Sequence, residues 1–270
     1  MTGEKLQSFE EFFASCSPEW RPQHVGKRIL HFSCVDSTNT LAQVYAVDRR
    51  YDGLILLADY QKAGRGRQQR RWYCPPGKGV LMSVVVFPPA TARQPAILTA
   101  WAAVSVCRTI YRLTGREAWI KWPNDVMIMG KKVCGVLVEQ TGAVIAGIGM
   151  NVSTTREELD NAGLHQATSL AAVLSPPPSV RQTALELVRN LDDFYQQICA
   201  GQAAQLEALW RWYTDLTGRR VRIEQAAGTL TGTLLECTFE RLLVQDERSR
   251  LHSLPPEQVL HVVALDDSSV

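Results

Sequence analysis

The chain has 270 residues, 46% hydrophobic and 21% charged, which is ordinary for a folded globular protein and enough for one large and one small domain. Its 29 basic and 27 acidic residues leave a net charge of +2, which argues against the broad basic surface of a general nucleic-acid-binding protein. Seven scattered cysteines form no C-x-x-C pair, which argues against a zinc ribbon, and no apolar run approaches the roughly 20 residues of a membrane span.

The first 27 residues are expected to form an N-terminal extension. Met1–Trp20 carries four glutamates and lacks the apolar segment of a signal peptide, so we expect a reduced, cytoplasmic protein. An apolar patch at Phe9, Phe12 and Phe13 indicates either a short helix that packs on the next domain or an adaptable arm.

Residues 28–216 alternate apolar strand patterns with helical ones, which predicts one large α+β domain. The expected strands are Arg28–Phe32, Leu54–Ala58, Leu81–Phe87, one beginning at Ala118, a hairpin over 127–140 that turns at Gly130–Lys132, and Ala143–Val152. The expected helices follow Ser37 and cover 95–113, 180–199 and 203–216, with short elements near 154–160 and 169–174.

Residues 217–270 change to a period of two. Four short strands are expected at 220–223, 228–235, 241–244 and 258–265. About 50 residues of β structure are near the lower limit of independent stability, so this small barrel should pack against the large domain. The fold class is therefore α+β, a mixed sheet flanked by helices followed by a small SH3-like β-barrel.

The segment Tyr60–Trp72 lies between two predicted core strands and carries five cations, two glycines and an indole. Glycines permit sharp turns and close approach of the backbone to a ligand, and guanidinium groups suit carboxylate or phosphate. We expect this loop to close over an anionic, phosphate-bearing intermediate. It is neither a Walker loop nor a Rossmann fingerprint, because the remaining residues of those motifs are absent.

Polar residues follow other predicted strands. Ser37-Thr38-Asn39 begins a helix, where free N–H groups can bind a polar ligand, although capping alone would also explain these residues. Lys121 lies among aromatic residues, either poised against a ligand or as a strand-edge lysine that reaches water. Asn151 ends a strand whose glycines indicate that something lies close to its backbone; it is either a ligand contact or a turn residue.

Three of these stretches occur in one order, Ser37-Thr38-Asn39, Gln61-x-x-Gly64-Arg65-Gly66-Arg67 with Arg70 and Trp72, and Lys121-Trp122-Pro123-Asn124-Asp125 followed by Gly135–Glu139. In the order and spacing of these motifs, from about Ile29 to Val152, the chain resembles the biotin–protein ligases, also called biotin–[acetyl-CoA-carboxylase] ligases. The resemblance implies a catalytic domain like those of class II synthetases. Some members carry an N-terminal DNA-binding helix-turn-helix, but about 27 residues precede the first strand here, so we expect the form without it and no binding to DNA.

The resemblance also implies a two-step reaction. Biotin and MgATP give biotinyl-5′-AMP, and the acyl group then passes to a lysine of a biotin carboxyl carrier protein or domain. Lys121 and Arg67 are the expected catalytic residues, and the metal ligands are not predicted. The expected biotin-binding residues are Ser37, Thr38, Asn39, Gln61, Arg65, Gly66, Arg67 and Lys121. The expected nucleotide-binding residues are Arg70, Trp72, Asn124 and Asn151.

One departure concerns the loop, because the family often has Arg-Gly where this chain has Gln68-Gln69. The missing glycine limits positive φ angles and the missing cation weakens the charge of the loop, so retention of the adenylate is in question.

The alternative functions are a lipoate or octanoate ligase of the same superfamily, a nucleic-acid-binding protein that uses the basic loop, and an inactive module that only binds biotin and ATP. An exposed sheet edge could also pair two chains into a homodimer.

Overall fold

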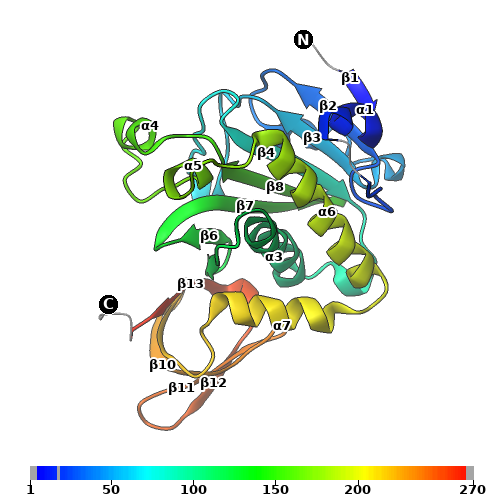
Figure 1. Ribbon diagram of the computed structural model, residues 1–270. Helices are drawn as coiled ribbons and strands as arrows, with labels where there is room; N and C mark the ends of the chain where they lie inside the picture. The colour runs from blue at the N-terminus through cyan, green and yellow to red at the C-terminus, as the bar shows by residue number, and fades with distance from the viewer. Residues whose placement is uncertain (1–4, 17–18, 266–270) are drawn as a thin grey trace.

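The computed structural model describes residues 5–16 and 19–265 and contains two β-sheets (Figure 1). The large sheet has eight strands in the order β1-β2-β3-β4-β8-β7-β6-β5, and the small one has five in the order β12-β11-β10-β9-β13. Strands β2 and β3 are parallel, whereas the other neighbours in the large sheet are antiparallel. The expected α+β architecture, a mixed sheet with helices and a small C-terminal β unit, is therefore confirmed.

The strands of the large sheet are β1 (Lys5–Ser8), β2 (Arg28–Phe32), β3 (Leu54–Ala58), β4 (Gly79–Val86), β5 (Trp119–Lys121), β6 (Asp125–Ile128), β7 (Lys131–Thr141) and β8 (Ala143–Asn151). Those of the small sheet are β9 (Arg220–Gln225), β10 (Gly228–Cys237), β11 (Leu242–Gln245), β12 (Leu251–Leu254) and β13 (Val259–Ala264). The helices are α1 (Phe9–Phe13), α2 (Thr38–Ala42), α3 (Pro95–Thr114), α4 (Arg156–Asn161), α5 (Leu170–Val173), α6 (Val180–Cys199) and α7 (Ala203–Thr214).

The two faces of the large sheet have different covers. Successive side chains of a strand point to opposite faces. On β4, Val80, Met82 and Val84 belong to the main core, which is shared with α3 and α6. Val85 belongs to a second apolar cluster with β2, β3 and the residues of α2. The long helices thus cover one face, and the short α2 packs on the other, where the site lies.

Helix α3 is the central support of the covered face. It begins with Pro95 at its first turn and ends at Gly115, whose φ of 65° closes the helix in the left-handed conformation. Trp101 is fully buried, and its Nε1 donates to the carbonyl oxygen of Leu191 on α6 at 2.8 Å. This bond satisfies the one polar atom of a large apolar side chain and ties the two helices together.

Helix α7 lies between the large domain and the small sheet (Figure 1). Its buried Trp210 packs against Trp122 after β5, with ring centroids 5.3 Å apart, and against Phe239, in the turn between β10 and β11, at 5.1 Å. Trp122 Nε1 also donates to the carbonyl oxygen of Val259 on β13 at 3.4 Å. The small sheet therefore leans on the large domain through shared aromatic packing, as its size predicted.

Three local details differ from the sequence expectation. Strand β1, which lies within the expected N-terminal extension, was not expected and joins the edge of the large sheet. The neighbouring α1, with Phe9, Phe12 and Phe13 buried, agrees with the short packing helix that was one of the two expectations for this segment. Strand β12 was not expected. The β6–β7 turn is Met129-Gly130, and Lys131 and Lys132 already belong to β7. Within residues 5–16 and 19–265, no helix is both long and apolar enough to cross a membrane.

Candidate functional site

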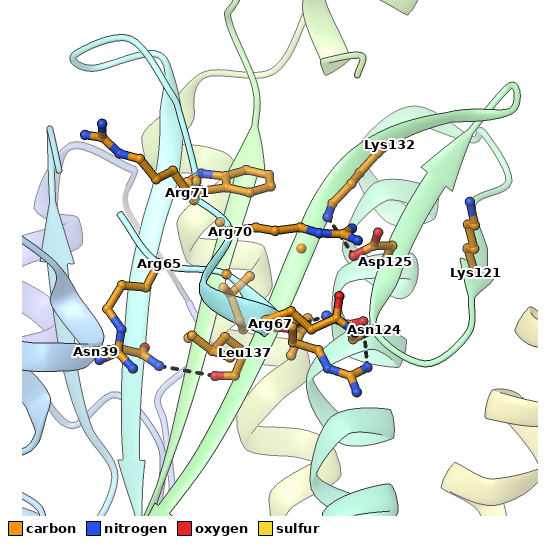
Figure 2. Close-up of a pocket in the computed structure, with 18 of the residues that line it drawn as sticks. Asn39, Arg65, Arg67, Arg70, Arg71, Lys121, Asn124, Asp125, Lys132 and Leu137 are labelled. Carbon is orange, nitrogen blue, oxygen red and sulfur yellow. Dashed lines mark hydrogen bonds and ion pairs between the residues drawn. The ribbon is translucent and has the colours of Figure 1, made fainter. Parts of the chain in front are cut away.

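A cavity of about 430 Å³ opens on the face of the large sheet that α3 and α6 leave uncovered. This volume is in the range of small-molecule sites, about 300–1,000 Å³. Of the twelve residues expected from the sequence to form the site, eleven line it: Ser37, Thr38, Asn39, Gln61, Arg65, Gly66, Arg67, Arg70, Trp72, Lys121 and Asn124. Figure 2 shows Asn39 and Arg65 at one side, Lys121 at the other, and Arg67 with Asn124 between them.

At the side of α2, the polar groups bond mainly to one another. Ser37 caps α2, and its Oγ accepts from the N–H of Thr40. Gln61 Oε1 accepts from the backbone N–H of Thr38 at 2.7 Å and lies 3.1 Å from the Thr38 hydroxyl. Because an amide nitrogen cannot accept a bond from an N–H group, this contact fixes the orientation of Gln61 and leaves its Nε2 group as a donor beside the cavity. We call Ser37, Thr38, Asn39, Gln61 and Ser83 the polar end.

Asn39 is 3% exposed and lies across three neighbouring strands. Its Oδ1 accepts from Ser83 Oγ on β4 at 2.6 Å, and its Nδ2 donates to the Leu137 carbonyl oxygen on β7 at 3.3 Å (Figure 2). Ser83, Gly147 and Leu137 are direct partners across β4, β8 and β7. A Cβ atom at Gly147 would lie 2.2 Å from Asn39 Oδ1, so the glycine makes room for the asparagine.

The loop after Gln61 forms a tight turn of its own. Trp72 N–H donates to the Gly64 carbonyl oxygen at 2.9 Å, and Gly66 N–H donates to that of Arg70 at 2.7 Å. At the tip, Gln68 and Gln69 have φ angles of 54° and 60°. The missing glycine was expected to limit positive φ angles in this loop. Both glutamines nevertheless adopt the left-handed conformation, which costs each about 1–2 kcal/mol, and the effect on adenylate retention stays a prediction.

Trp72 packs on the same face of the sheet as Asn39, about 7 Å further along the strands. It lies over Gly149 of β8 and Gly135 of β7, which are direct partners two residues beyond the Leu137–Gly147 pair that Asn39 contacts. A Cβ atom at Gly149 would lie 2.5 Å from the indole, and one at Gly135 would lie 3.2 Å from it. The strand glycines that indicated close approach to the backbone thus admit Asn39 and Trp72. The indole Nε1 is buried and has no hydrogen-bond partner in the part of the chain that is described.

At the opposite side, cations face the cavity with few partners. Arg67 Nη1 donates to Asn124 Oδ1 at 3.3 Å, and Asn124 Nδ2 donates to the Val136 carbonyl oxygen at 2.6 Å. Burial lowers the pKa of the Arg67 guanidinium, and the charge of Asp125 opposes that shift; an arginine nevertheless stays charged. Lys121 and Arg70 make no ion pair or side-chain hydrogen bond among the residues the structure describes. We call Arg67, Arg70, Lys121 and Asn124 the cationic end.

Two carboxylates are available to balance these charges. Asp125 pairs with Lys132 at 2.7 Å, and Lys132 Nζ also lies 5.6 Å from the centroid of the Trp72 ring. Glu224 of β9 is the other acidic residue in the lining. Nowhere in residues 5–16 and 19–265 do three histidine, cysteine or acidic side chains come together as they would to hold a metal ion.

Four residues of the small sheet complete the wall, which sequence reasoning did not anticipate. Glu224 on β9 and His261 on β13 are paired in register, and Val262 and Val263 follow. Ser83 and Lys132 were missed too, because their place in the site depends on strand register and not on a local motif. The motif Gly135–Glu139 was noted in the sequence, but the contacts of Glu139 were not.

Asn151 is the expected residue that does not line the cavity. It is the last residue of β8, 2% exposed, and its Nδ2 donates to the carbonyl oxygen of Thr168 at 3.0 Å. Its amide oxygen is buried and without a partner among the described residues. The side chain therefore ties β8 to the segment before α5.

The cavity joins uncharged hydrogen-bonding groups at one end to unpaired cations at the other. Such a site suits an elongated ligand with a neutral polar head and an anionic reacting group, because half-buried Arg67 and exposed Lys121 and Arg70 have charges that an anionic group can pair with in charge-assisted hydrogen bonds.

The fold and the site together define a class of protein. Residues 31–153 match the model of the biotin/lipoate A/B protein ligase family. The chain belongs to this family.

Among its relatives, the bifunctional ligase/repressor BirA of Bacillus subtilis is 29% identical over 226 residues, which cover 82% of this chain and 70% of that protein. The biotin–[acetyl-CoA-carboxylase] ligase of Mycobacterium tuberculosis is 36% identical over 183 residues, 66% of each chain. The biotin protein ligase of Aquifex aeolicus, solved with biotin and ATP, shares the fold with a TM-score of 0.75 and 24% identity, covering 87% of this chain and 98% of that one.

Proposed function

We propose that this protein is a biotin protein ligase that activates biotin with ATP and transfers it to a lysine of a carrier domain of acetyl-CoA carboxylase or a related carboxylase. The observation that carries the proposal is the joining, in one cavity, of the polar end to the cationic end. The named relatives are biotin ligases, which supports this reading over the alternatives.

The polar end suits the ureido ring of biotin, which offers two N–H donors and one carbonyl oxygen. Gln61 Nε2 is a donor beside the cavity, and the hydroxyls of Ser37 and Thr38 add small polar groups. A site that hydrogen-bonds a polar head rejects an analogue lacking it, because its own groups would stay unpaired. Lipoate has no ureido ring, so this end favours biotin over lipoate or octanoate.

The cationic end suits the reacting centre. In the first step an oxygen of the biotin carboxylate bonds to the α-phosphorus of ATP, and the bond from that phosphorus to pyrophosphate breaks. Two anions must approach each other, and preorganised cations offset the repulsion; one such donor typically contributes about 3–4 kcal/mol in the transition state. In the proposal, Lys121 and Arg67 have this role. Two loop residues, Arg65 and Gly66, contact biotin. The nucleotide is contacted by Arg70, Trp72 and Asn124. A nucleotide contact by Asn151 stays a prediction.

In the second step the ε-amine of the carrier lysine attacks the acyl carbon. A C–N amide bond forms, the C–O bond to AMP breaks, and the amine loses a proton. An acyl-adenylate hydrolyses readily, so a loop that excludes water over the cavity has a clear use. We propose that the turn from Gly64 to Trp72, whose residues line the cavity, serves as that cover.

Magnesium would accompany the phosphates and neutralise part of their charge. The lining offers two carboxylates, of which Asp125 is already paired with Lys132. This sparse set fits an ion that is held mainly by phosphate oxygens and water, as is usual for Mg²⁺.

We also propose that the enzyme is cytoplasmic and that it does not act as a repressor. Operator-specific DNA binding at physiological salt would contradict the absence of a repressor role.

Transfer of labelled biotin to a carrier domain, with and without ATP and beside a lipoate arm, tests the proposal. We expect ATP-dependent labelling by biotin alone. Labelling by lipoate instead would favour the related ligase activity, and biotin binding without transfer would identify an inactive binding module. Steeply salt-dependent binding to generic DNA would favour a nucleic-acid role for the basic loop.

A further inference from the structure

Glu139 on β7 bonds to two separate elements around the cavity without lining the cavity itself. Its Oε2 accepts from Asn39 Nδ2, in the first turn of α2, at 2.8 Å. Its Oε1 pairs with Nη2 of Arg65, in the loop. The side chain is 21% exposed, so water competes little for either oxygen. One carboxylate thus joins α2 and the loop to the central sheet.

Glu139 also decides how Asn39 is oriented. Asn39 Nδ2 faces two groups that can only accept, the Glu139 carboxylate and the Leu137 carbonyl oxygen, and Oδ1 faces the Ser83 hydroxyl. Turning the amide over would set its oxygen against the Glu139 carboxylate, so the carboxylate excludes that state. The packing of Asn39 over Gly147 depends on this orientation.

The ion pair between Glu139 and Arg65 attaches the loop to the sheet. Within the described residues, it is the one ion pair between the segment 61–72 and the rest of the protein. Arg65 Nη1 also donates to Thr40 Oγ1 at 3.1 Å, and Arg67 donates to Asn124 at 3.3 Å. The other bonds near the tip stay within the loop. Charge-assisted hydrogen bonds are roughly twice as strong as neutral ones, so the contact with Glu139 is the firmest side-chain anchor of the loop.

We propose that Glu139 is a positioning residue that fastens the Gly64–Trp72 loop to the polar end before any ligand binds. It acts through Arg65 and Asn39, and it sets the affinity for biotin and the retention of the adenylate. The second part rests on the proposed function. The first part concerns the loop of the ligand-free protein and does not depend on it.

Glu139→Gln separates these roles from simple packing. Glutamine has nearly the same shape but only one acceptor oxygen, so its NH₂ group must face either Arg65 or Asn39, both of which donate. We expect amide hydrogen exchange of residues 64–72 in the ligand-free protein to rise about tenfold. The KM for biotin and the release rate of the adenylate should rise by a similar factor, whereas kcat at saturating biotin and the KM for ATP should change less than twofold.

Two further variants serve as comparisons. Glu236→Gln removes a similar carboxylate that pairs with Arg241 at 2.6 Å on the small sheet, away from the cavity, and should change none of these values. Arg65→Gln breaks the same link from the exposed loop side, where folding is not at stake. Its exchange should match that of Glu139→Gln, and the double variant should exceed neither single variant.

Unchanged loop exchange in Glu139→Gln, or exchange in the double variant that multiplies the two single effects, would overturn the anchoring role. Raised exchange with an unchanged KM for biotin and unchanged adenylate release would overturn the link to affinity. Raised exchange in a protein whose wild type makes no biotinyl-adenylate would support the anchor and count against the proposed function alone.

Discussion

The two ends of the cavity differ in how far their polar groups are satisfied. At the polar end, Thr38, Asn39, Gln61 and Ser83 form a connected set of hydrogen bonds. At the cationic end, Arg67 has one neutral partner, and Lys121 has no bonded partner among the described residues. A preformed end can discriminate between similar ligands, while an end with unpaired cations is suited to charge that appears during a reaction. In the proposed function, this difference gives recognition to the polar end and chemistry to the cationic end.

The largest effect is expected at the cationic end. Lys121→Ala should reduce adenylate formation roughly a hundred- to a thousandfold, because it removes a donor aimed at developing charge. The side chain is exposed and unpaired in the described structure, so the unfolding midpoint should hardly change. Biotin-dependent ATP–pyrophosphate exchange measures the rate. Lys131→Ala, an exposed lysine at the start of β7 outside the lining, is the matched control. Equal rates in the two variants would remove Lys121 from the mechanism.

A second variant tests the cover over the same end. Arg67→Gly should increase release of the adenylate by roughly ten- to a hundredfold, since it removes a half-buried cation that bonds to Asn124 and, in the proposed function, faces the anionic intermediate. The expected signs are a faster off-rate of the intermediate and labelling of lysines on bystander proteins. An off-rate equal to that of the wild type would contradict the retaining role of the loop.

Two glycines on one face of β8 allow a paired test of whether the two ends of the cavity bind different substrates. Gly147→Ala displaces Asn39 and should raise the KM for biotin about tenfold, because the polar end loses its arrangement. Gly149→Ala displaces Trp72 and should raise the KM for ATP by a similar factor. Steady-state kinetics with each substrate varied, together with thermal unfolding of both variants, gives the comparison. If both substitutions shift both constants equally, the two ends are not separate.

The smallest effect concerns the loop tip. Gln69→Gly relieves a left-handed backbone at φ 60° and should stabilise the protein by roughly 0.5–1 kcal/mol, because the greater entropy of unfolded glycine cancels part of the gain. Chemical denaturation measures this, and Gln69→Ala, which keeps the strain, should give no gain. A loss of stability in the glycine variant would show that Gln69 makes contacts worth more than its strain.

Much of the fold could be predicted because long apolar runs are unambiguous. All of β4 and all of β3 are buried, and α3 has a proline at its start and a glycine at its end. The two missed strands are short and lie at sheet edges. In β12 the residues alternate between exposed and half-buried, and Leu6 of β1 is 57% exposed, so neither strand has a clear apolar pattern.

The site was predictable where its chemistry is local in the chain. Ser37–Asn39 and the loop around Arg67 are recognisable as motifs, and the structure brings them together in one cavity. Ser83 and Glu139 act only because strand register places them beside Asn39, and a one-residue slip would turn them to the other face. His261 lies more than a hundred residues beyond Lys121, and its place depends on how the two sheets pack.

A crystal structure with biotin and a non-hydrolysable ATP analogue would test the separation of the two ends most directly. We expect the ureido ring to lie against Thr38 and Gln61, and the α-phosphate to lie within about 3 Å of Lys121 Nζ or the Arg67 guanidinium. A ureido ring at the cationic end, or an α-phosphate held by neither cation, would show that the two ends do not have separate roles.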